Sequence, residues 1–182
     1  MELNKRHNSG EAENARDRAE RNSNEGVAAM TTADHIANGL GLIIDEHDAQ
    51  YCLVAAAQKA FVNELDPAIT AGLLSMLLQC TETHAMSEER LMQLCDFPEY
   101  AHHVGKHNQL VEKVQTILCT YRSGQRRRVA DQLDAFADAL NGHIGEDDAA
   151  LQRHLLRFCP GRSAHCTLKL LVFVCRLGGR RS

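Results

Sequence analysis

The 182-residue chain contains no tryptophan, only three prolines and few aromatic side chains. It also lacks a large net charge: the formal value is -4, which gives no general reason to expect nucleic-acid binding. No apolar run approaches the roughly 20 residues that a membrane-spanning helix needs, and the longest, residues 170–175, is far shorter. The composition therefore predicts a globular protein that binds neither nucleic acid nor a membrane.

The seven cysteines are an odd number, scattered through segments with helical periodicity, and no secretory signal opens the chain. This usage fits reduced thiols in a cytosol better than a disulfide framework, so we expect a cytoplasmic protein. Cys159, His165, Cys166 and Cys175 lie near the C-terminus without a paired C-x₂-C. A zinc site there is less favoured than a loosely docked or mobile extension.

The length allows one domain with a sizeable core. Residues 1–30 are rich in Glu, Arg, Asn and Ser and have few large apolar side chains, so we expect them to be disordered. Helical periodicity begins after that segment and continues to about residue 153. The expected organisation is a domain over residues 31–153, followed by an extension over 154–182 whose role the sequence does not indicate.

Within the domain, the periodicity predicts a short amphipathic segment over Thr32–Gly41 and then four helices. Their approximate ranges are 42–63, 66–94, 99–121 and 125–153. Apolar side chains expected on the inward faces include Ile43, Val54 and Phe61 on the first helix, Ile69, Leu73 and Leu77 on the second, Leu110 and Val114 on the third, and Leu133 and Phe136 on the fourth.

Two pairs of possible metal ligands lie on these helices: His84 with Glu88, and His103 with His107. Both pairs are four residues apart, which places the two side chains on one helix face with Cβ atoms about 5–6 Å apart. If antiparallel helices share a site, the connecting turns lie midway between ligands. Three such midpoints fall beside chain-breaking residues: Glu88 to His103 at Asp96–Pro98, His47 to His84 at Asp66–Pro67, and His107 to His143 beside Ser123–Gly124. The inference is an all-α, up-down-up-down four-helix bundle with one polar cluster in its core.

The donors that such a bundle gathers are five imidazoles and two carboxylates, namely His47, His84, Glu88, His103, His107, His143 and either Asp147 or Asp148. They are too many for one zinc ion and include too few carboxylates for calcium. They suit a pair of metals such as iron or manganese, which carboxylates can bridge. Any one of these histidines alone is more often a surface or satisfied core residue. Burying all seven groups without a metal, however, would be costly.

Over about residues 40–150 these motifs resemble the hemerythrin family. The pattern consists of a lone His47, H-x₃-E at His84, H-x₃-H at His103 and H-I-x₃-D at His143. The strings E-E-R-L-M and F-P-E-Y are similar to those of bacterial hemerythrins in particular. The resemblance implies a four-helix bundle around a non-haem di-iron centre, that is, two iron ions (Fe²⁺/Fe³⁺) bridged by carboxylates and an oxo or hydroxo group.

Carried onto this chain, the resemblance implies that one iron is bound by His103, His107 and His143, and the other by His47 and His84. Glu88 and the aspartate of the fourth helix would bridge them, leaving one coordination position open on the second iron. Asp147 shares the face of His143 in a regular helix, whereas the family pattern selects Asp148. Because a π-bulge after Asn141–Gly142 would bring the i+5 residue into line, we expect Asp148 to be the ligand. Glu89 and His102 each lie about 100° round the helix from the adjacent ligand, so they are expected to be outward-facing or flank groups.

Three positions are expected to line an oxygen pocket: Gln50, Ala85 and Ile144. The family usually has an apolar residue at the first and an aromatic one at the second, so the pocket is expected to be more open or more polar. Three classes remain: reversible dioxygen binding for carriage, storage or sensing; a di-iron enzyme or sensor acting on peroxide or nitric oxide; and a metal-free helical module. No substrate-binding motif or nucleophile with a base is present, so dioxygen binding ranks above catalysis. The buried polar set disfavours the metal-free module.

Overall fold

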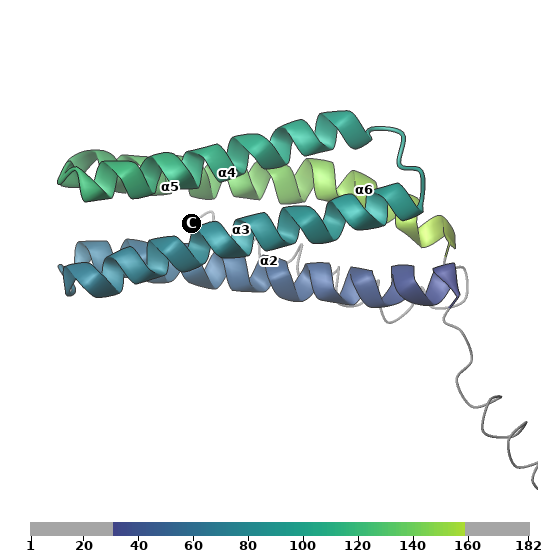
Figure 1. Cartoon of the computed structure of the whole chain (residues 1–182), viewed down its shortest axis with the longest axis horizontal. Helices are drawn as coiled ribbons and strands as arrows, with labels where there is room; N and C mark the ends of the chain where they lie inside the picture. Colours follow the sequence, from purple (N-terminus) through teal and green to yellow (C-terminus); the bar gives the residue numbers. More distant parts are fainter. Residues whose placement is uncertain (1–30, 159–182) are drawn as a thin grey trace, which may run out of the picture. The chain divides into compact units, whose positions relative to one another are not determined.

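The computed structural model describes residues 31–158, and nearly all of this stretch is helical. The helices are α2 (Thr32–Val62), α3 (Pro67–Leu94), α4 (Tyr100–Arg122), α5 (Arg126–His143), the π-helix η1 (Ile144–Asp148), α6 (Ala149–Leu155) and the 3₁₀ turn η2 (Leu156–Phe158). The elements α5, η1 and α6 follow one another as a single rod, called the fourth rod below (Figure 1). The predicted all-α, up-down-up-down four-helix bundle is therefore confirmed, whereas the expectations for residues 1–30 and 159–182 lie outside the described residues.

The turns fall where the chain-breaking residues predicted them. The side chain of Asp66 caps α3 by accepting a hydrogen bond from the Ala68 N–H at 2.7 Å, and Pro67 occupies the first helical position. Such a cap contributes about 1 kcal/mol. Asp96 takes a positive φ of 48°, and Gly124 one of 77°, so each allows a sharp reversal. In Figure 1 the turns after α2 and α4 lie at one end of the bundle, and the turn after α3 lies at the other.

The separate amphipathic segment expected over Thr32–Gly41 is wrong, because α2 runs through it without a break. Tertiary packing explains the difference. Ile36 and Leu40 are buried, and a Cβ added at Gly39 would lie 2.6 Å from side-chain atoms of Leu91 in α3. Glycine there lets the two helices approach closely, and the packing offsets its helix-forming cost of about 1 kcal/mol.

Two smaller expectations also change. Ile69 was expected to face inward but is 53% exposed; Thr70 and Leu74 take the inner positions in that part of α3. At the other end, the packed helix continues past the expected boundary at residue 153, since Leu155 is fully buried. Apolar periodicity alone leaves the inner position at a helix end, and the end itself, uncertain by one or two residues.

The bundle interior contains two apolar clusters. One, called the Phe136 cluster, contains Val54, Ala57, Leu74, Leu77, Leu110, Val114, Ile117, Leu118, Val129, Leu133, Phe136, Leu140 and Ile144. The other, called the Met92 cluster, contains Ile36, Leu40, Ile43, Leu91, Met92, Cys95, Phe97, Leu151 and Leu155. In α2 the two clusters are separated by the polar pair His47 and Gln50. Within residues 31–158, no helix is long and apolar enough to cross a membrane.

Candidate metal centre

Seven polar side chains that the sequence singled out lie between the two apolar clusters, and none is more than 4% exposed. α2 supplies one of them, α3 and α4 supply two each, and the fourth rod supplies two; the residues are His47, His84, Glu88, His103, His107, His143 and Asp148. The structure thus gathers at one depth residues that are up to 101 positions apart in sequence, since 148 minus 47 is 101.

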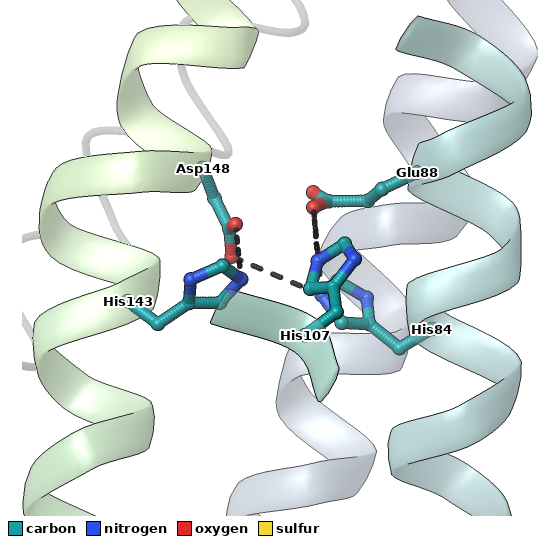
Figure 2. Close-up of side chains that lie close together, drawn as sticks. All are labelled: His84, Glu88, His107, His143 and Asp148. Atoms are coloured by element: carbon teal, nitrogen blue, oxygen red, sulfur yellow. Dashed lines mark ion pairs between the residues drawn. The ribbon is translucent and has the colours of Figure 1, made fainter. Parts of the chain in front are cut away.

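Donor atoms of five of these residues all lie within 4.8 Å of one another (Figure 2): His84, Glu88, His107, His143 and Asp148. The other two join them through Asp148, whose Oδ2 lies 2.9 Å from His47 Nε2 and whose Oδ1 lies 3.2 Å from His103 Nε2. Glu88 Oε2 lies 2.9 Å from His103 Nε2 and 3.3 Å from His107 Nε2. The two carboxylates therefore connect imidazoles from all four rods.

The residues fit a metal better than they fit one another. Two ligands about 2.1 Å from one ion and at right angles lie about 3 Å apart, close to the 2.9 Å between His143 Nε2 and Asp148 Oδ1. Yet this contact lacks hydrogen-bond geometry. His84 Nε2, His143 Nε2, Glu88 Oε1 and both Asp148 oxygens are buried without a hydrogen-bond partner among the described residues. Each such atom costs about 1–3 kcal/mol, so a cation that accepts their lone pairs would remove a large penalty.

A family model agrees with this chemistry. The model described as hemerythrin HHE cation-binding domain matches residues 38–155, which include all seven donors. The chain belongs to the hemerythrin family. Comparisons with curated proteins and with solved structures give no significant match. A buried cluster of His, Glu and Asp in a cation-binding family indicates metal binding, and what the metal does is taken up below.

The fourth rod of this hemerythrin domain contains the π-turn that the sequence analysis invoked to choose between two aspartates. Residues Ile144–Asp148 form a π-helix directly after His143. Because a π-turn contains one extra residue, it places the i+5 side chain on the same face of the helix as the histidine. Asp148 is fully buried in the centre, whereas the Asp147 side chain is 20% exposed and lies 3.1 Å from Nδ1 of His143.

Three outer carboxylates, which sequence reasoning did not assign, orient the hemerythrin imidazoles. Glu46 lies 3.3 Å from His84 Nδ1, Glu89 lies 3.3 Å from His107 Nδ1, and Asp147 lies 3.1 Å from His143 Nδ1. A carboxylate at Nδ1 places the proton there and leaves Nε2 as the ligand atom. Glu46 is itself held by the Ser87 hydroxyl, which donates to its Oε1 at 2.8 Å.

A signal for these outer groups was present in the sequence. Each is the immediate neighbour of a proposed ligand, so it lies about 100° round the helix. Glu89 was expected on a flank, and it does lie there; in a bundle, however, the flank faces the next helix. Its side chain is 28% exposed and contacts His107 of α4. His102, the other flank residue, is 62% exposed and 3.8 Å from Asp147.

Charges in the metal-free centre are balanced by protons. Burial acts to lower the pKa of His84, but nearby carboxylates, above all Asp148, outweigh it and raise the pKa to about 10. The same balance raises the pKa of His103 to about 9. Burial acts to raise the pKa of Glu88 and of Asp148, but the surrounding imidazoles hold both below their usual range. A cation entering the centre therefore has to displace protons from imidazoles.

The structure also places the three expected pocket residues. Gln50 is fully buried on α2, three residues after His47; Ala85 is 7% exposed on α3, and Ile144 is 4% exposed at the start of the π-turn. Ile144 belongs to the Phe136 cluster. All three are adjacent in the chain to a proposed ligand or one turn from it.

Proposed function

We propose that this hemerythrin domain is a non-haem di-iron protein that binds dioxygen reversibly, for carriage, storage or sensing. The observation that carries the proposal is the convergence of five buried imidazoles and two buried carboxylates, in which His84 Nε2, His143 Nε2, Glu88 Oε1 and both Asp148 oxygens have no hydrogen-bond partner among the described residues. A single iron takes at most six ligands, so seven donors with two potential bridges support two metal ions.

In the proposed centre, His103, His107 and His143 would hold one iron, His47 and His84 would hold the other, and Glu88 and Asp148 would be shared between the two. The support for the bridging role is that each carboxylate contacts imidazoles of both sets. Asp148 lies 2.9 Å from His47 and 2.9 Å from His143. Glu88 lies 2.9 Å from His103 and 3.8 Å from His84.

The metal pair, when bound, supplies electrons and an open coordination position for a small ligand. The protein's own contribution is to orient the ligand imidazoles and to shield the centre from solvent. Glu46, Glu89 and Asp147 fix three imidazoles with Nε2 inward. The Phe136 and Met92 clusters close both ends of the centre with apolar side chains, which excludes water and external reductants from it.

The test is anaerobic loading of the metal-free protein with Fe²⁺, followed by exposure to air and then removal of oxygen. We expect two iron ions per chain, a visible charge-transfer band in air, and loss of that band when oxygen is removed. His103→Ala should abolish the second equivalent of iron, whereas His102→Ala, at an exposed neighbouring position, should leave both. Binding of one iron or none by the unaltered chain would contradict the proposal.

A second candidate is a di-iron enzyme or sensor that acts on peroxide or nitric oxide. It is favoured by one observation: Gln50 places a buried polar amide one helical turn from His47. Apolar side chains at that position would better protect a bound dioxygen in a carrier. Rapid, irreversible bleaching of the band in air, together with sustained turnover of added peroxide or nitric oxide, would select this candidate over reversible dioxygen binding.

A further inference from the structure

Among residues 31–158, Gln50 is the one fully buried side-chain amide within a helical turn of a proposed ligand, and the proposed donor set does not use it. Its exposure is 0%, and neither Oε1 nor Nε2 has a hydrogen-bond partner within the part of the chain that the structure describes. Buried amides in folded proteins are almost always hydrogen bonded. A buried amide without a partner among residues 31–158 therefore points to a partner from outside this part of the chain.

The place of Gln50 follows from helix geometry. In each rod, the residue three positions from a proposed ligand histidine, in the direction of the Phe136 cluster, is buried. These residues are Gln50 (His47 plus three), Thr81 (His84 minus three), Leu110 (His107 plus three) and Leu140 (His143 minus three). Because neighbouring rods are antiparallel, the alternating signs lead to the same end of the bundle. The four side chains form one layer next to the centre on the side of the Phe136 cluster, to which Leu110 and Leu140 themselves belong.

The remaining proposed ligands lie on the opposite side of the centre. Glu88 follows His84 in α3, Asp148 follows His143 in the parallel fourth rod, and His103 precedes His107 in antiparallel α4. All three offsets lead toward the Met92 cluster. Figure 2 shows Glu88 and Asp148 on one side of the imidazoles of His84, His107 and His143. A small exogenous ligand is therefore expected to approach from the layer that contains Gln50.

That layer is polar on one half only. Gln50 and Thr81 are the neighbours of His47 and His84, the two histidines that would hold the iron with the open position, while Leu110 and Leu140 are the neighbours of His107 and His143. The Thr81 hydroxyl already donates to the Leu77 carbonyl at 2.8 Å. The hydrogen-bond donors left in this half of the layer are the two N–H bonds of Gln50 Nε2.

On these grounds, and resting on the di-iron function proposed above, we infer that Gln50 donates a hydrogen bond to a small ligand at the open position. The ligands that it favours are diatomic or triatomic molecules and anions with an acceptor atom away from the metal, such as dioxygen or azide. Gln50 is thus a specificity-determining residue of the centre: it holds a donor in place before the ligand arrives, at the expense of the stability of the ligand-free protein.

The experiment compares the unaltered chain with Gln50→Leu, which keeps the approximate volume and removes the amide. Azide binding to the oxidised, iron-loaded protein is followed by visible spectroscopy, and the midpoint of thermal unfolding is measured for the metal-free protein. We expect the azide dissociation constant to rise roughly tenfold and the metal-free midpoint to rise by about 2–4 °C. Gln152→Leu is the matched control, since Gln152 is also buried but lies in α6 with the Met92 cluster; its azide constant should not change.

The outcomes separate the inference from the function on which it rests. An unchanged azide constant in Gln50→Leu, with normal binding by the unaltered chain, overturns the role of Gln50 and leaves the di-iron proposal standing. A lower unfolding midpoint of metal-free Gln50→Leu also overturns it, because the amide would then have a partner within the protein. Failure of the unaltered chain to hold two iron ions removes the proposed function and the inference together.

Discussion

α3 and the fourth rod each bring one imidazole and one carboxylate to the same centre, but they do so with different backbones. In α3, a regular helix places His84 and Glu88 four residues apart on one face. In the fourth rod, His143 and Asp148 are five residues apart, and the π-turn Ile144–Asp148 absorbs the extra residue. The comparison teaches that the imidazole and the carboxylate of each rod must lie on the same helix face and at the same depth in the bundle. The number of residues between them then depends on whether the local backbone is an α-helix or a π-helix.

Removing the inner carboxylate from either rod is expected to have the largest effect. Glu88→Gln and Asp148→Asn each delete a charge that contacts several imidazoles, so each should lose one or both iron ions. Metal content after iron loading, measured by mass spectrometry, gives the result. Asp147→Asn is the matched control in the fourth rod and should still bind two ions at saturating iron, though more weakly, because Asp147 contacts His143 from outside the centre. Loss of metal from Asp147→Asn alone would reverse the assignment of the two aspartates.

Single-residue deletions compare the two backbones directly. Deleting exposed Gly145 removes the extra residue of the π-turn, so Asp148 becomes i+4 to His143, and the buried residues after it keep their face. Two metal ions should still bind. Deleting Met86, which is 72% exposed in α3, rotates Glu88 by about 100° away from His84 and brings Glu89 to the i+4 position. In a Glu89→Ala background, where no carboxylate takes that position, the deletion should abolish binding that Glu89→Ala alone retains. Equal loss in both deletions would show that the π-turn has a role beyond register.

Replacing the outer carboxylates that contact His84 of α3 and His143 of the fourth rod should have a smaller effect on metal binding. Glu46→Gln, which weakens the partner of His84, and Asp147→Asn, which weakens that of His143, are each expected to reduce metal affinity about 10–100-fold. The number of bound ions should remain two at saturation. Competition with a chelator of known affinity measures the change. An affinity within twofold of the unaltered chain would mean that Nε2 of these imidazoles is fixed by packing alone.

A pH titration of the metal-free protein is expected to give the smallest change. The pKa of His84 is raised to about 10 and that of His103 to about 9, above the value of about 6.5 in an unfolded chain. Their stabilising contribution is therefore complete below about pH 6.5 and is lost as the pH rises through about 9–10. The thermal midpoint of the metal-free protein should fall over that interval, while the iron-loaded protein should change less, because its imidazoles are already neutral ligands. A midpoint that rises between pH 7 and 10 would contradict this charge arrangement.

Much of the fold could be predicted from particular residues. Asp66–Pro67, Asp96–Pro98 and Ser123–Gly124 mark turns, and their positions midway between possible ligands fix which helices are antiparallel. The continuity of α2 through Gly39 could not be predicted, because glycine in a sequence indicates a helix break. The contact with the Leu91 side chain, which makes a glycine favourable here, is visible only in the folded structure. The inward position of Ile69 was predicted wrongly because, near a helix end, apolar periodicity alone does not decide which of two adjacent residues is covered.

The sequence by itself determined which donors this protein has and that helical spacing places them on shared faces, because i and i+4 geometry is a property of one helix. It also determined the antiparallel topology, through its turns. Only the tertiary structure decided what surrounds each donor: that three outer carboxylates contact the imidazoles, and that the amide of Gln50 is buried without a hydrogen-bond partner among residues 31–158. These facts depend on contacts between rods, and a contact between residues far apart in the chain has no local signature.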